Sequence, residues 1–356
     1  MYKKVLLFFL SMAFLVGVRA QTQAPNPGFE DWPGSSTSSP KGWHSYDEAA
    51  GVFSGAASNK SGNPTALERV SGHSGKYACV IRCNKILGVA ANGALTTGRV
   101  YMGAMSASSA KNYCYSDRAG GYAYRFTGRP DSLYLWAKFK MNGDVCATAK
   151  AHLHTDCDFR DFVDVGQSSD VASAIMYIKD KGKGGWHQYK QAFKAYASPQ
   201  KATAEQAPIP TVTKWTRRPS YLLLSFSTNR YVMKGSKGDA LYIDDIKMIY
   251  NKALSSIQIN GDTMLAFDKG ILDYTWILPD NATELPVISA ETESPRAELL
   301  IEQATWQNPV ATITVFHDDV YSGEAEPRTY TINFINPQLI SNIFPKITLI
   351  NHIFNL

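Results

Sequence analysis

The chain has 356 residues, of which 44% are hydrophobic and 19% charged, and its formal net charge is +5. This is the composition of a globular protein that can bury a core, and the length predicts two or three domains. The positive charges are spread along the chain without a dense Lys/Arg block, so nothing here favours nucleic acid as a partner.

The first twenty residues predict a secretory signal peptide. A basic start, Met1–Lys4, precedes an apolar run that ends in small residues at Ala20. No Cys follows this run, so there is no lipobox, and no later stretch is apolar enough to span a membrane. We therefore expect an exported protein that is periplasmic, displayed on the cell surface or secreted.

Five cysteines follow, an odd number that leaves at least one without an intramolecular partner: Cys79, Cys83, Cys114, Cys146 and Cys157. An oxidising compartment permits disulfides. Cys79 and Cys83 would lie about 13 Å apart on an extended chain, too far for a bridge. Cys146 and Cys157 are the better candidate pair, across a predicted hairpin.

Short apolar or alternating runs, bounded by Gly, Pro, Asn or Ser, predict strands over 76–83, 131–141, 172–180, 186–193, 220–228 and 240–250. Within 132–140, one face would carry Leu133, Leu135, Ala137 and Phe139, and the other Tyr134, Trp136, Lys138 and Lys140. The spacing of these runs predicts an all-β sandwich rather than βαβ units.

A domain boundary is predicted near Asn251. After it, about seven short strands in about 85 residues, with turns at Asn260-Gly261 and Ser322-Gly323, fit a small immunoglobulin-like sandwich without the paired cysteines of antibody domains. The predicted organisation is a signal peptide over 1–20, a first domain over 21–250, a second over 251–336, and a disordered or poorly packed tail over 337–356.

Several pieces of residues 25–250 together resemble one known family. They are Asn26–Trp32 (NPGFEDW), Thr127–Pro130 (TGRP) running into the strand Tyr134–Lys140, Pro219–Tyr231, and Gly238–Ile246 (GDALYIDDI). They are similar to the Bacteroidetes family called the putative carbohydrate metabolism domain (PCMD). The resemblance implies a galactose-binding-like jelly roll, here followed by the small immunoglobulin-like sandwich, and a role in carbohydrate binding.

The resemblance also implies a metal site. In the jelly roll the first and last strands lie close together, which would bring Glu30 to Asp244 and Asp245. Ca²⁺ accepts carboxylate and carbonyl oxygens, so a structural calcium ion is expected there. The alternative is that Asp244 points out of a sheet edge and Asp245 caps a turn, with no ion.

Aromatic side chains opposite the core stripe are the candidate sugar platforms, namely Tyr134, Trp136, Trp186 and Tyr189. Trp32 and Trp43 are candidates too, but large aromatic residues dominate cores, and core packing is the favoured interpretation for both. Arg125 and Arg129 flank the TGRP turn and would supply hydrogen bonds in a groove. Their alternative is solvent exposure or a salt bridge.

The segment KAHLHTDCDFRDF is the most polar part of a predicted strand. His152, His154, Asp156 and Asp158 would share one face, a weak signal for a metal site. The alternative is a solvated strand end or part of a ligand groove. A glycosidase needs two carboxylates at a set separation, and no pair stands out. No G-x-S-x-G motif is present, and we assign no catalytic residue.

The sequence thus predicts a non-catalytic glycan-binding protein that acts in bacterial polysaccharide utilisation. Its expected partners are a glycan or polysaccharide and other cell-envelope proteins. Two alternatives stay open: a structural or adhesive surface protein without a sugar site, and a glycoside hydrolase or lyase.

Overall fold

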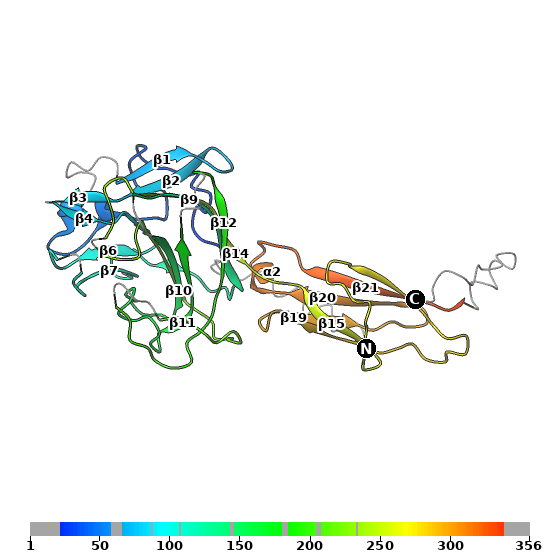
Figure 1. Cartoon of the computed structure of the whole chain (residues 1–356). Helices are drawn as coiled ribbons and strands as arrows, with labels where there is room; N and C mark the ends of the chain where they lie inside the picture. Colours follow the sequence, from blue (N-terminus) through cyan, green and yellow to red (C-terminus); the bar gives the residue numbers. More distant parts are fainter. Residues whose placement is uncertain are drawn as a thin grey trace.

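The computed structural model describes residues 22–57, 66–86, 88–106, 108–142, 146–179, 184–203, 208–232 and 234–337. These residues form two β-sandwiches that lie end to end, as Figure 1 shows. The all-β fold class is therefore confirmed. The predicted signal peptide, and the predicted tail beyond residue 337, lie outside the described residues. None of the helices among the described residues is long and apolar enough to cross a membrane.

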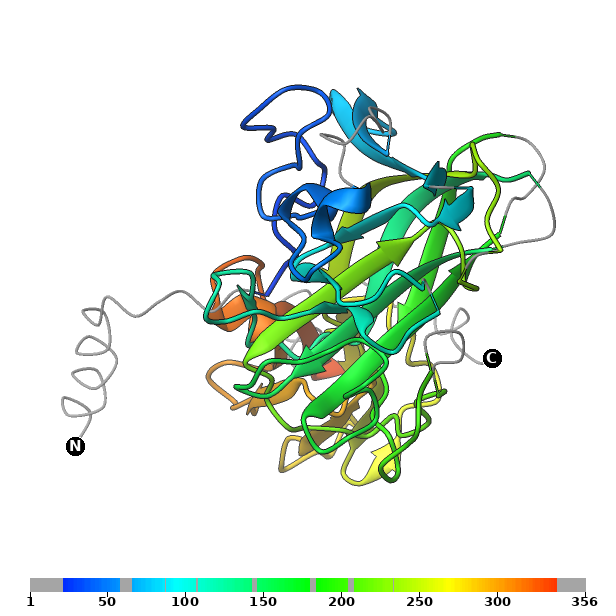
Figure 2. The same ribbon diagram turned by 90° about the vertical axis from the view of Figure 1, so that its left-hand side faces the viewer.

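The larger sandwich consists of two sheets that face each other (Figure 2). The first sheet has the strand order β1 (Leu67–Ser71), β2 (Tyr77–Arg82), β14 (Ala240–Ile249), β9 (Ser132–Lys140) and β12 (His187–Ala192). The second has the order β11 (Asp170–Ile178), β10 (Ala147–His154), β13 (Tyr221–Ser227) and β5 (Ala94–Thr96), and β8 (Tyr124–Arg125) also pairs with β13. All of these pairs are antiparallel.

The core between the sheets follows from the two-residue period of the strands. On β9, Leu133, Leu135, Ala137 and Phe139 are buried in the core, as predicted, and the residues between them face outward. Trp43 is also a core residue: its ring lies 5.4 Å from that of Phe29 and 5.8 Å from that of Phe226. This confirms core packing for Trp43, while Trp32 is partly buried against the same core.

The opening segment is not a strand, contrary to what the jelly-roll resemblance implies. Asn26 and Phe29 have positive φ values, 39° and 53°, which interrupt an extended chain. The Phe29 N–H donates to the Asn26 carbonyl, and the Asn26 amide side chain bonds both the N–H and the carbonyl of Asp31. The segment is therefore a compact turn, and the fully buried Phe29 anchors it in the core.

Residues 44–125 hold short elements that the sequence patterns did not predict. They are the 3₁₀ helices η1 (Tyr46–Glu48) and η2 (Ser54–Ala57), the hairpin of β3 (Asn84–Ile86) and β4 (Val89–Ala91), and the hairpin of β6 (Arg99–Met102) and β7 (Asn112–Tyr115). Strands of three or four residues are too short to show a periodicity.

The smaller sandwich has its own core, with buried residues from Leu254 to Phe334, whereas those of the larger one run from Ala24 to Tyr250. One sheet orders β16 (Asp262–Thr263), β15 (Leu254–Ile259) and β18 (Ile288–Thr292). The other orders β17 (Asp273–Ile277), β21 (Arg328–Ile335), β20 (Val310–Phe316) and β19 (Glu298–Glu302), with β17 and β21 parallel. Asn260 and Gly261, both at positive φ, form the predicted turn between β15 and β16.

The predicted Cys146–Cys157 disulfide is wrong. Cys146 lies just before β10 and Cys157 just after it, so the two residues flank one strand instead of facing each other across a hairpin. A strand of this length spans about 26 Å, whereas bridged Cα atoms lie no more than about 7 Å apart. None of the five cysteines, all of which are among the described residues, forms a disulfide.

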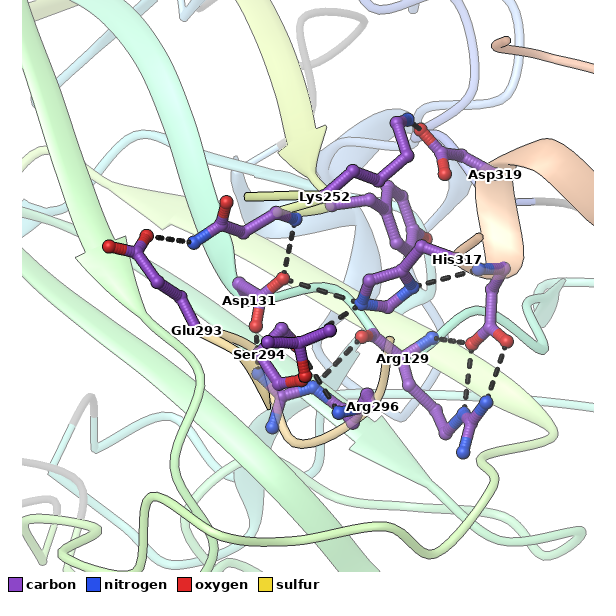
Figure 3. Close-up of polar contacts among 12 residues, drawn as sticks. Arg129, Asp131, Lys252, Glu293, Ser294, Arg296, His317 and Asp319 are labelled. Atoms are coloured by element: carbon purple, nitrogen blue, oxygen red, sulfur yellow. Dashed lines mark hydrogen bonds and ion pairs between the residues drawn. The ribbon is translucent and has the colours of Figure 1, made fainter. Parts of the chain in front are cut away.

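A buried polar interface joins the two sandwiches (Figure 3). Arg129, in the TGRP turn, donates from Nε and Nη2 to the carboxylate of Asp318, at 2.9 and 2.8 Å. Asp318 begins the short helix α2 (Asp318–Tyr321) of the smaller sandwich, and both side chains are nearly inaccessible to solvent. A buried, bidentate pair of this kind fixes both the distance and the orientation of the two domains.

Asp131 is the second contact of this interface and directly precedes β9. Its carboxylate accepts from the Arg296 guanidinium and from the backbone N–H of Asn251, and His317 Nε2 lies 3.4 Å away (Figure 3). Lys252 pairs with Asp319 at 2.5 Å beside them. The smaller sandwich therefore contacts the larger one at the start of β9, the strand that carries Tyr134 and Trp136.

Candidate functional site

The outer face of the first sheet carries a strip of aromatic rings beside its central strand. Trp136 on β9 lies parallel to the imidazole of His73, with 3.9 Å between ring centroids and an interplanar angle of 16°. Trp186, just before β12, meets His73 edge-on at 5.8 Å, and Tyr242 on β14 lies 6.4 Å from Trp186. All four rings are half-buried, so part of each is open to solvent. We call Trp136, His73, Trp186 and Tyr242 the aromatic strip.

Polar groups border the strip on the same face. Lys138 Nζ lies 4.2 Å from the centre of the Tyr242 ring and 5.3 Å from that of Trp186, a cation–π arrangement that fixes both rings. Gln188 on β12 lies directly opposite Trp136 and is exposed. A flat apolar surface with amide and ammonium groups at its border is suited to a ligand that has one apolar face and polar edges.

His73 comes from the turn between β1 and β2, and a bulge in β14 holds it in place. The β14–β9 register shifts between Asp244 and Lys247, and Asp245 has a φ of 49°. The Asp244 carboxylate accepts the His73 backbone N–H at 2.7 Å, and Asp245 Oδ2 lies 2.8 Å from His73 Nδ1. The two acids thereby set the position of the ring that stacks on Trp136.

Glu30 contacts the same turn from the opposite side. Its Oε1 accepts the backbone N–H groups of Lys76 and Tyr77, at 2.8 and 3.1 Å. The structure thus brings the three predicted metal ligands, Glu30, Asp244 and Asp245, to one turn, although Glu30 is not on a strand. Asp244 is fully buried on a central strand and does not point out of a sheet edge. Burial is the main reason that the pKa of Asp244 is raised to about 6, and the Asp245 charge adds to it.

The donor atoms around this turn suit a hard cation. A Cβ atom added to Gly72 would lie 2.3 Å from the Ser74 carbonyl, 2.8 Å from the Tyr77 carbonyl and 3.1 Å from Asp244 Oδ2. This point is one bond length from Gly72 Cα and is not itself an ion position, but the contacts show that two carbonyl oxygens and one carboxylate oxygen lie close together on this side of the turn. The described residues contain no group of three or more His, Cys, Asp or Glu side chains that could hold a metal ion. An ion here would therefore depend on backbone carbonyls, with Asp244 as its side-chain ligand.

Three residues predicted for the sugar site lie elsewhere. Tyr189 pairs with Leu135, so it is on the core side of β12, where its hydroxyl donates to the Lys179 carbonyl at 2.9 Å. Arg125 is on β8, paired with the second sheet, with its guanidinium over Tyr221. Arg129 is buried in the domain interface and pairs with Asp318. A salt bridge was the predicted alternative to a role in the sugar groove. Tyr134, Trp136 and Trp186 are on the outer face of the first sheet.

The HLH segment of β10 does not form a metal site. His152 and His154 are fully buried on the side of the second sheet that faces away from the core. The strand ends at His154, and Asp156 and Asp158 turn outward to pair with Arg118. The prediction of a shared face for all four side chains is wrong, because it required the strand to continue past residue 154. The alternative of a solvated strand end is wrong for the two histidines as well.

His73 and Tyr242 are the members of the strip that sequence reasoning missed. Tyr242 is two residues after Ala240 in a predicted strand, and register with β9 would have placed it beside Lys138. His73 is in a turn, where no periodicity indicates the direction of a side chain.

No family model matches the chain, and no curated protein matches it. The resemblance to the PCMD family therefore stays a prediction. Among solved structures, a "putative glycoside hydrolase" from Bacteroides thetaiotaomicron matches with 15% identity and a TM-score of 0.45, over 65% of this chain and 72% of that one.

A "putative glycoside hydrolase" from Bacteroides vulgatus matches with 14% identity and a TM-score of 0.37, over 52% of this chain and 77% of the other. TmCBM61, solved with β-1,4-galactotriose, matches with 12% identity and a TM-score of 0.29, over 64% of this chain and 97% of the other. Likenesses at this level add nothing to the β-sandwich fold described above.

Proposed function

We propose that this protein binds glycans through the outer face of the first sheet. The observation that carries the proposal is the aromatic strip, with its half-exposed rings and its polar border of Lys138 and Gln188. An indole or phenol face covers the apolar C–H face of a pyranose, while the border groups bond its hydroxyls. Export, which residues 1–20 predict, would bring this face to extracellular polysaccharide.

We propose that binding is not accompanied by hydrolysis. A glycosidase needs two carboxyl groups on opposite sides of the scissile bond, one of them as a proton donor. The acids nearest the strip, Asp244 and Asp245, are consecutive in sequence and both hold the β1–β2 turn through hydrogen bonds. This arrangement supports a binding role.

We also propose a structural Ca²⁺ at the β1–β2 turn, held by Asp244 and by backbone carbonyls of the turn. When bound, the ion would neutralise the buried carboxylate. The gathering of Glu30, Asp244 and Asp245 at one turn, with the Asp244 carboxylate buried, supports the proposal. Because His73 belongs to the same turn, the ion would steady one ring of the aromatic strip.

A glycan array with the chain from residue 21 onward tests the binding proposal. We expect Trp186→Ala to weaken binding of the retained glycan more than tenfold, because this ring contacts His73, Lys138 and Tyr242 on the outer face. Trp306→Ala is the matched control, since Trp306 is exposed on the smaller sandwich. Unchanged affinity in Trp186→Ala, or an array without any retained glycan, would contradict the proposal.

A further inference from the structure

Four lysines share the outer face with the aromatic strip. On β9, Lys138 and Lys140 alternate with the core residues just as Tyr134 and Trp136 do. Lys190 on β12 and Lys247 on β14 lie directly opposite Tyr134, one on either side of it. Neighbouring strands are about 4.8 Å apart, so the backbones of Lys190 and Lys247 are separated by roughly 10 Å, with the Tyr134 side chain between them.

The four lysines of this face are not paired with acids among the described residues. None of the four lysines forms an ion pair with a described carboxylate, and Lys140, Lys190 and Lys247 are exposed. The acids nearby already have partners: Glu68 pairs with Arg82 at 2.9 Å, and Asp245 with His73 and Ser74. Cations gathered without anions raise the local potential and attract anionic ligands.

We infer that the glycan bound by this face is anionic, and carries carboxylate or sulfate groups. The inference rests on the proposed function and specifies its ligand. The aromatic strip would stack on the sugar rings, while Lys190 and Lys247 would meet acidic groups on the two sides of Tyr134. Such contacts between exposed charges are screened by salt, so the preference for an acidic polymer should fall as ionic strength rises.

Single-stranded nucleic acid is the other polyanion that combines stacking with positive charge. The structure favours a sugar, because the Trp136 ring is covered by His73 and the Trp186 and Tyr242 rings are partly covered by Lys138. On β9 itself, the outward side chains after Tyr134 and Trp136 are Lys138 and Lys140, so this strand offers two rings and no longer run on which successive bases could stack. An oligonucleotide therefore belongs in the test as a competing ligand.

The experiment uses isothermal titration of the chain from residue 21 onward with matched polymer pairs. Polygalacturonate is compared with its fully methyl-esterified form, and dextran sulfate with dextran, so that charge changes while the backbone is kept. We expect at least one acidic polymer to bind about tenfold or more tightly than its neutral partner, and the ratio to shrink between 0.05 and 0.5 M NaCl. A preference within the polygalacturonate pair indicates recognition of carboxylate groups, and a preference within the dextran pair indicates recognition of sulfate groups.

The double variant Lys190→Gln/Lys247→Gln should lose most of this preference and keep the residual affinity for the neutral polymer. Lys201→Gln/Lys214→Gln, exposed positions after β12 and away from this face, should keep the preference. Equal affinity for both members of each pair would overturn the inference and leave the proposed function standing. If no polysaccharide binds, both fail. Tighter binding of a poly(dT) oligonucleotide than of any polysaccharide would overturn the inference in favour of nucleic acid.

Discussion

His152 and His154 are two residues apart on β10, yet their surroundings make one of them charged and the other neutral. The single hydroxyl proton of Ser173 goes to Asp170, so Ser173 Oγ accepts from His152 Nδ1, and His152 Nε2 lies 3.6 Å from Asp161. Burial alone would lower the pKa of His152, but the two carboxylates outweigh it and raise the pKa to about 9.

His154 is held in its neutral form. It donates from Nδ1 to the Thr155 carbonyl and accepts the Ser116 hydroxyl proton at Nε2. Burial lowers the pKa of His154 to about 4. His152 is therefore protonated, and both ring nitrogens of the neutral His154 are used in hydrogen bonds, which is why neither is available as a metal ligand.

The charged state of His152 makes stability depend on pH. Its folded pKa lies above the unfolded value of 6.5, so its stabilising effect is complete below about pH 6.5 and is lost as pH rises through about 9. A shift of this size corresponds to about 3 kcal/mol. We expect the free energy of unfolding, from urea titrations, to fall between pH 6.5 and 9.5. The fall should be smaller in His152→Gln, and an equal fall in the variant would show that other groups cause it.

At the scale of elements, the β1–β2 turn depends on three carboxylates from distant parts of the chain. Gly75 within it has a φ of +60°, and a Cβ there would lie 2.2 Å from Glu30 Oε1. Gly75→Ala would therefore strain the backbone and push Glu30 away from its two N–H donors. We expect it to lower the free energy of unfolding by about 1–3 kcal/mol, measured by urea titration, with Gly261→Asn as a control at a positive-φ turn with open space. Unchanged stability would mean that the turn does not need Glu30.

The proposed calcium ion belongs to the same element. We expect added Ca²⁺ to raise the melting temperature of metal-free protein, and EDTA to reverse the change. Asp244→Asn should abolish the response to Ca²⁺, whereas Asp156→Asn, at an exposed site paired with Arg118, should keep it. If Ca²⁺ leaves the melting temperature of the wild-type protein unchanged, the proposal of a structural calcium ion is wrong.

Strand alternation explains how much of this architecture the sequence could predict. It predicted the longer strands of the larger sandwich and the outward direction of Tyr134 and Trp136, because each of these runs was long enough to show its period, but it missed short strands such as β5 and β8. The prediction of Tyr189 for the sugar face was wrong, because residues three apart on one extended run point to opposite faces, and Tyr189 therefore lies on the face opposite to that of Trp186. Strand alternation also failed for Arg129, whose partner Asp318 is 189 residues away. A contact between residues so far apart in the chain produces no local sequence pattern from which it could be predicted.

For the whole molecule, the interface should make the two sandwiches unfold together. Asp318→Ala would leave the buried Arg129 guanidinium without its partner, a loss that typically costs about 3–5 kcal/mol. By differential scanning calorimetry we expect one transition in wild-type protein and two in Asp318→Ala. Asp280→Ala, at an exposed site on the smaller sandwich, should behave as wild type. A single transition at the wild-type temperature in Asp318→Ala would show that this pair does not couple the domains.

The attachment of Asp131 at the base of β9 also determines how the molecule carries tension. A polymer held at Trp136 and pulled away from the smaller sandwich would load β9 along its length, because Arg296 and His317 anchor that strand at its first residues. β9 is hydrogen-bonded to β14 on one side and β12 on the other. The ladders would then be loaded in shear, with many hydrogen bonds sharing the force, and would not be peeled apart one bond at a time.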